Sequence, residues 1–116
     1  MPTDLQTLTQ ALRDFANARD WAQFHSPKNL ASALSVEAAE LLEHFQWLTE
    51  EQSRNLAAPQ KAEVAAEAAD VLLYLLQLCD KLNIDLVEAA RLKMIVNGEK
   101  YPVASARGSS QKFTET

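Results

Sequence analysis

The sequence predicts an all-α fold. The chain of 116 residues contains only two glycines and four prolines, so few positions interrupt a helix. No window shows the alternating, β-branched pattern of a strand, whereas several windows carry apolar residues at spacings of three and four. Apolar residues make up 47% of the chain, enough for one compact core. We therefore expect one helical domain rather than disorder or two domains.

The first predicted helix covers about residues 4–19. Apolar side chains from Leu5 to Phe15 recur along it at three- and four-residue spacing and form one stripe. The connector that follows, DWAQFH at 20–25, is unusually aromatic for a loop.

The second predicted helix begins after Ser26, which suits an N-cap, with Pro27 in the first turn. Its apolar pattern continues to about Leu48. Thr49 and Gln52 then have the spacing of a capping box, which predicts one or two further helical turns.

The third predicted helix begins at Pro59 and reaches about Leu82, and Asn83 suits a left-handed exit from it. Asp85 and Glu88 have the spacing of another capping box and open a fourth helix, which continues to about residue 98.

The composition changes after Pro102 to small and polar residues. We therefore predict a helical domain at 1–102 and an irregular C-terminal tail at 103–116.

Two pairs of acids lie on faces where a core would be expected. Each helical residue turns about 100°, so Glu37 and Glu40 share a face of the second helix, and Glu67 and Asp70 share a face of the third. The second pair begins the apolar run 71–76, which we expect to be largely buried. Buried carboxylates are costly unless they pair, shift their pKa or bind a metal.

If the two helices pack antiparallel through these faces, all four acids converge on one point. Ligands that are all oxygen suit Mg²⁺ or Mn²⁺ better than zinc. The alternative, two solvated helix faces that bind nothing, remains open at this stage.

Charge and cysteine content limit the partners. A net charge of −5 disfavours a nucleic-acid polymer, although a nucleotide that arrives with a metal remains compatible. The single cysteine, Cys79, indicates a reducing compartment. The N-terminal residues lack the pattern of a signal peptide, and the longest apolar run is too short to cross a membrane. We expect a cytoplasmic protein.

The acids carry a resemblance to a known family. Glu37-Ala-Ala-Glu40 followed by Glu67-Ala-Ala-Asp70 resembles the Glu-x-x-Glu…Glu-x-x-Asp signature of the all-α nucleoside triphosphate pyrophosphohydrolases, which include the MazG-like proteins. Five segments resemble the dCTP pyrophosphatase branch in their order and spacing: RDWAQFHSPKNLASAL, FQW, AADVLLYLL, KMIVNGEKYPV and ARGSSQK.

The resemblance implies a fold, an assembly and a reaction. The fold is a four-helix bundle of the MazG-like type, assembled as a homotetramer that is a dimer of dimers. The reaction is Mg²⁺-dependent hydrolysis of a (deoxy)nucleoside triphosphate at the α-phosphate, which yields the monophosphate and pyrophosphate. Mn²⁺ can substitute for Mg²⁺, dCTP or a modified dCTP is favoured, and the role is removal of unwanted nucleotides from the pool.

The resemblance also assigns site residues. The catalytic and metal-binding residues are Glu37, Glu40, Glu67 and Asp70. The substrate-binding residues are Trp21, Ala22, Gln23, Phe24, His25, Trp47, Tyr74, Lys93, Asn97, Lys100 and Tyr101. One position departs from the animal members, which place a first-helix histidine near the base where this chain has Leu12. We therefore expect less strict base selection, because hydrogen bonds to a base edge discriminate better than apolar packing.

Two other classes of protein stay open. The first is a helical oligomer that binds nucleotide without hydrolysing it. The second is a purely structural helical oligomer, in which the aromatic connector would have no evident purpose.

Overall fold

The structure is a computed structural model that describes residues 1–110. Over this range it is helical without a strand, which confirms the predicted all-α class. Contacts divide the chain into one compact unit at Met1–Asn83 and a second unit from Ile84 onward, and each is described by itself. Within the described range, no helix is both long and apolar enough to cross a membrane.

The chain begins with α1 (Asp4–Ala18), close to its predicted bounds. A capping box starts this helix: the Thr3 hydroxyl accepts from the Gln6 amide at 3.2 Å, and the Gln6 side chain accepts from the Thr3 amide at 2.8 Å. Asp20 then adopts a left-handed backbone with φ 55°. The aromatic connector that follows contains the short 3₁₀ helix η1 (Ala22–Phe24).

The second helix, α2 (Pro27–Glu43), begins as predicted but ends earlier. The prediction carried it to Leu48, and this was wrong by about one turn. After Glu43 the amides of Phe45 and Gln46 both donate to the Leu42 carbonyl, so the hydrogen bonding tightens into a turn. The apolar pattern continues through this turn, which is why periodicity alone missed the end of the helix.

The N-caps predicted for the second helix and for the short helix that follows it are both present. The Ser26 hydroxyl accepts from the Asn29 amide at 3.1 Å and caps α2. Thr49 and Gln52 form the reciprocal capping box of α3 (Glu50–Arg54).

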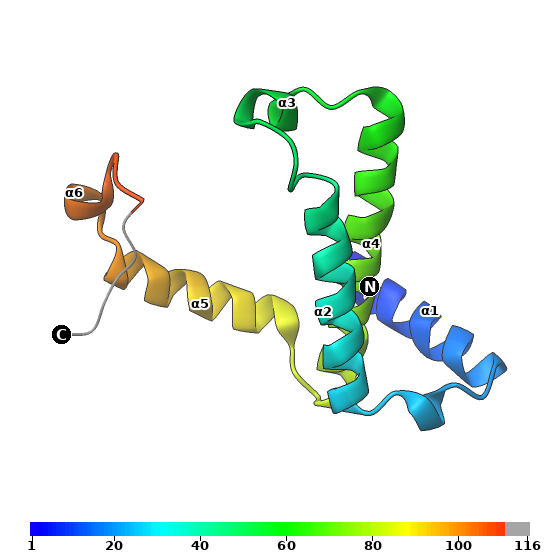
Figure 1. The fold of residues 1–116 in the computed structure, drawn as a ribbon. Coiled ribbons are helices and arrows are strands. Elements are labelled where there is room, and N and C mark those ends of the chain that lie inside the picture. The colour runs from blue at the N-terminus through cyan, green and yellow to red at the C-terminus, as the bar shows by residue number, and fades with distance from the viewer. Residues whose placement is uncertain (111–116) are drawn as a thin grey trace. The chain divides into compact units, whose positions relative to one another are not determined.

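The longest helix is α4 (Ala58–Lys81), and it returns antiparallel beside α2 (Figure 1). The predicted left-handed exit follows at Asn83, with φ 54°. Helix α1 also packs against α4, so α4 is the central element of this unit.

The buried side chains come from all three long helices of this unit: Ala16, Leu30, Leu76 and Cys79. The expectation that the run 71–76 is largely buried was only partly right. Leu76 is buried, whereas Leu72 is exposed in the single chain because helices α1 and α2 cover only part of the α4 surface.

The second unit contains α5 (Leu86–Lys100), which extends two residues beyond the prediction. The Asp85 carboxylate caps it by accepting from the Glu88 amide at 3.1 Å. The reciprocal half of the predicted capping box does not form, because the Glu88 carboxylate instead accepts from Arg91 at 3.0 Å.

The predicted irregular tail contains a short helix, α6 (Val103–Ala106), so that prediction was wrong for these residues. Pro102 is the N-cap of this helix, where the missing backbone N–H of proline removes no helical hydrogen bond. Residues 111–116 of the predicted tail lie outside the described range. The four-helix bundle stays a prediction, because its fourth helix, α5, belongs to the second unit.

Candidate functional site

Three of the four predicted acids meet between α2 and α4. Glu37 on α2 and Glu67 and Asp70 on α4 each offer one carboxylate oxygen, and these oxygens all lie within 4.8 Å of one another. The antiparallel packing of the two helices brings the acids together, although Glu37 and Glu67 are 30 positions apart in the sequence. We call Glu37, Glu67 and Asp70 the acid cluster.

The acid cluster contains two oxygens that lack a hydrogen-bond donor. Glu37 Oε2 and Glu67 Oε2 are buried and have no hydrogen-bond partner. A buried carboxylate oxygen without a donor or cation is unfavourable, and two of them in one cluster of acids are worse because like charges repel. A divalent cation would supply the missing partner to both, and hard oxygen ligands are those that Mg²⁺ and Mn²⁺ prefer. The donor set therefore fits such a cation.

The other two acids are placed differently from the expectation. Asp70 is exposed rather than buried, so it forms the solvent-facing side of the acid cluster. Glu40 lies beside Glu37 but does not join the group of three. The structure therefore brings together three of the predicted ligands and leaves the fourth adjacent to them.

The crowding of these acids raises two pKa values. The pKa of Glu37 is raised chiefly because its protonated form can share a hydrogen with Glu67, and burial and repulsion from Glu67 and Asp70 act in the same direction. Sharing a hydrogen with Glu40 acts on the pKa of Glu37 in the opposite direction. The pKa of Glu40 is raised mainly because its protonated form can share a hydrogen with Glu37, and the charge of the Glu37 carboxylate acts in the same direction. Without a cation, the site therefore resists ionisation.

This crowding predicts a pH-dependent stability in metal-free buffer. The folded-state pKa of Glu37 exceeds its ordinary value of 4.5, so its favourable contribution is complete below pH 4.5 and is lost as the pH rises through the raised value. Glutamine mimics the uncharged form at every pH. We expect Glu37→Gln to raise the melting temperature near neutral pH, with a gain that shrinks toward pH 4.5.

Thermal unfolding followed by circular dichroism in EDTA, at several pH values, measures this gain. A pH-independent difference between the two proteins would show that Glu37 carries no unfavourable charge in the folded state.

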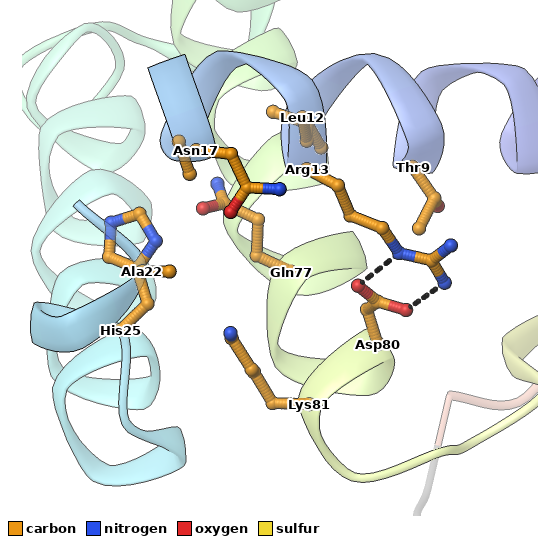
Figure 2. Close-up of a pocket in the computed structure, with 10 residues that line it drawn as sticks. Thr9, Leu12, Arg13, Asn17, Ala22, His25, Gln77, Asp80 and Lys81 are labelled. Carbon is orange, nitrogen blue, oxygen red and sulfur yellow. Dashed lines mark hydrogen bonds and ion pairs between the residues drawn. The ribbon is translucent and has the colours of Figure 1, made fainter. Parts of the chain in front are cut away.

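A polar cleft lies in the same unit, between α1, η1 and α4. Its volume is about 340 Å³, and we call it the α1–α4 cleft. Its lining residues are Thr9, Leu12, Arg13, Ala16, Asn17, Ala22, His25, Gln77, Asp80 and Lys81. Figure 2 shows the Asn17, Gln77 and Lys81 side chains and the His25 ring around one space.

One wall of the α1–α4 cleft is closed by an ion pair between α1 and α4. Arg13 Nε donates to Asp80 Oδ2 at 2.8 Å, and a second bond joins Arg13 Nη2 to Oδ1 (Figure 2). The hydrogen bonds from Arg13 lower the pKa of Asp80, and the positive charge of Arg13 acts in the same direction. The Asp80 charge is therefore compensated within the protein and is not available to a ligand.

The aromatic connector contributes to the cleft through two of its five predicted residues. Ala22 and His25 line it. Trp21 instead packs edge-on against Phe15, with ring centroids 5.7 Å apart. The Gln23 side chain donates to the Asp20 carbonyl at 3.0 Å and so holds the connector together, and Phe24 is exposed.

The other residues that were predicted to bind the substrate lie on three further segments. Tyr74 is half-buried on α4, one turn after Asp70. Trp47 is 87% exposed and lies on the turn after α2, although the predicted second helix would have included it. Lys93, Asn97 and Lys100 lie on α5, and Tyr101 caps it. These four belong to the second unit, and their contact with a nucleotide stays a prediction.

Sequence reasoning missed several polar residues of the cleft, including Asn17, Gln77 and the Arg13–Asp80 pair. A signal was available for Gln77, because it interrupts an otherwise apolar stretch of α4 and shares a face with Asp70. Asn17 and Arg13 gave no such signal, since polar residues on the first helix are expected to face solvent.

The helical fold and the acid cluster define an all-α protein with a candidate divalent-metal centre. The model of the MazG-like family matches residues 32–116. The chain therefore belongs to the MazG-like family, as its motifs indicated.

Individual relatives refine this placement. The chain is 41% identical over 113 residues to dCTP pyrophosphatase 1 of Mus musculus and 40% identical to that of Homo sapiens, covering 96% of this chain in both cases. It spans 66% of the length of each of these relatives. A crystal structure of a pyrophosphatase from Archaeoglobus fulgidus matches with a TM-score of 0.82 and 44% identity, over 88% of this chain and 95% of that one. The resemblance to the dCTP pyrophosphatase branch is thereby confirmed.

Proposed function

We propose that this protein is a Mg²⁺-dependent nucleoside triphosphate pyrophosphohydrolase. The observation that carries this proposal is the acid cluster, with two buried carboxylate oxygens that lack any partner, in a chain of the MazG-like family. The names of the relatives, dCTP pyrophosphatase 1 and a pyrophosphatase, agree with this activity. The reaction would release a nucleoside monophosphate and pyrophosphate.

The acids have separate roles in this proposal. Glu37, Glu67 and Asp70 hold the cation, which when bound offsets the charge of the phosphoryl oxygens and makes a water more acidic. Glu40 is adjacent but outside the group of three, so it is free to orient the attacking water and accept its proton. The water oxygen forms a bond to the α-phosphorus, the bond from that phosphorus to the bridging oxygen breaks, and pyrophosphate leaves.

We infer a deoxynucleotide substrate, with dCTP or a 5-modified dCTP first. The supporting residues for the base are His25 and Ala22, which line the α1–α4 cleft, together with Trp21, Trp47 and Tyr74 through the family resemblance. By the same resemblance the phosphates and sugar would contact Lys93, Asn97, Lys100 and Tyr101. The cellular role would be to remove unwanted deoxynucleotides, and the free, buried thiol of Cys79 suits a cytoplasmic location.

Incubation with dCTP tests the reaction. We expect dCMP and pyrophosphate as products in Mg²⁺, separated by anion-exchange chromatography, and no product in EDTA. Release of orthophosphate would contradict attack at the α-phosphorus. Nucleotide binding without any product would favour the alternative, a non-catalytic nucleotide-binding oligomer.

Steady-state kinetics across the ribonucleotides and deoxynucleotides tests the substrate. We expect a higher kcat/KM for dCTP than for CTP. Equal values would exclude a preference for deoxynucleotides.

We also propose a homotetramer built as a dimer of dimers. Helix α5 exposes five large apolar side chains, and exposed apolar surface of this kind is typical of protein–protein interfaces: Val87, Leu92, Met94, Ile95 and Val96. Light scattering should give four times the chain mass of 12.9 kDa. A mass equal to one chain would contradict this assembly.

A further inference from the structure

The α1–α4 cleft lies on the same side of α4 as the acid cluster. Gln77 follows Asp70 by seven residues, which on a helix returns to within about 20° of the same direction and advances by about 10 Å. The sugar and base of a nucleotide span a comparable distance. A nucleotide with its phosphates at the acid cluster can therefore place its base in this cleft.

The carboxamide of Gln77 has a fixed orientation. Its Nε2 donates to the Leu73 carbonyl at 3.2 Å, and only the amide nitrogen can pair with a carbonyl oxygen. This bond uses one of the two Nε2 hydrogens and fixes Oε1 as the acceptor that the carboxamide offers to a ligand. This half-buried side chain is directed toward Asn17 and the open space of the cleft (Figure 2).

The other polar groups of the cleft leave room for a neutral ligand with both donors and acceptors. Within residues 1–110, the Asn17 carboxamide makes no hydrogen bond and the Lys81 ammonium makes no salt bridge. The one carboxylate in the lining, Asp80, is bound by Arg13. A cationic ligand would thus find no free anion, whereas a base edge finds one fixed acceptor together with the Asn17 and Lys81 donors.

We propose that, within the α1–α4 cleft, Gln77 Oε1 accepts a hydrogen bond from an exocyclic amino group of the base. Gln77 is then a specificity-determining residue that selects cytosine over uracil, because cytosine carries an amino donor where uracil carries a carbonyl acceptor. A carbonyl opposite Gln77 Oε1 would leave two acceptors facing each other without a proton between them. This inference rests on the proposed function, since it places the phosphates at the acid cluster.

The test compares dCTP with dUTP, which differ in this amino group. In Gln77→Leu the ratio of kcat/KM for dCTP over dUTP should fall about 10-fold, as expected for the loss of one selective hydrogen bond. Gln77→Glu keeps acceptor oxygens and should retain the preference for dCTP. Gln60→Leu is the matched control. Gln60 lies on the same helix but outside the cleft lining, so its substitution should leave the ratio unchanged.

An unchanged ratio in Gln77→Leu, or an equal loss on both nucleotides, would overturn the inference while leaving the proposed hydrolysis intact. Equilibrium binding of the non-hydrolysable α,β-imido analogues of dCTP and dUTP separates the two questions. If the protein hydrolyses neither nucleotide, the proposed function fails, but the binding ratio still decides whether Gln77 reads the base. Equal affinities of the parent for the two analogues would overturn the inference.

Discussion

Glu67→Gln is expected to lower kcat on dCTP by at least about 100-fold. Loss of a residue that only hydrogen-bonds to a metal ligand can already cost about 100-fold, and Glu67 is proposed to bind the metal directly. The substitution keeps the shape of the side chain and removes the charge that would hold the cation. Glu67 belongs to the acid cluster, and its Oε2 is buried without a hydrogen-bond partner. Calorimetric titration with Mg²⁺ should show a weaker affinity in parallel with the lost activity.

Glu63→Gln provides the matched control for this prediction. Glu63 lies one turn earlier on α4, and its side chain is 69% exposed. Its Oε2 lies 3.9 Å from His44 Nδ1. The same chemical change there should leave kcat and Mg²⁺ affinity close to the parent values. If Glu67→Gln retained the parent's kcat, the acid cluster would not be the catalytic centre.

Leu30→Ala is expected to lower the free energy of unfolding by about 2–5 kcal/mol, the usual range for a leucine truncated in a core. Leu30 is only 1% exposed and is the largest fully buried side chain of the described residues. It precedes Glu37 by seven residues on α2, which places both on nearly the same face. Loss of its packing should therefore loosen the helix face that carries Glu37, and urea unfolding at equilibrium measures the change.

The control for Leu30 is Leu42→Ala on the same helix. Leu42 is 60% exposed, so its truncation should cost much less. A cost at Leu30 as small as that of an exposed leucine would contradict the assignment of Leu30 to the core.

The acid cluster shows a conflict between function and stability. The pKa of Glu37 is raised chiefly by a hydrogen that its protonated form can share with Glu67, with burial and charge repulsion acting in the same direction. The ionised acids therefore destabilise the metal-free fold, yet their crowding makes a divalent cation favourable at this point. A cation that binds only the folded state stabilises it by mass action. The protein should therefore gain stability from Mg²⁺, and Glu37→Gln should lose most of that gain.

Local signals in the sequence were sufficient for most helix boundaries. Ser26, Thr49 and Asp85 act as N-caps, and Asn83 adopts the left-handed exit, because these effects depend on residues within one turn of each other. The end of α2 was predicted too late, since the apolar spacing continued through a turn in which only the hydrogen bonding changed.

The sequence by itself determined the helical class, the caps and the identity of the acids, because composition, helical period and the family motif are local properties of the chain. Only the tertiary structure decided that Glu37, Glu67 and Asp70 meet while Glu40 lies beside them, since this depends on the register of α2 against α4. The same is true of the α1–α4 cleft. Asn17 and Gln77 come from helices that are distant in sequence, and only the packing of α1 on α4 places their carboxamides around one space.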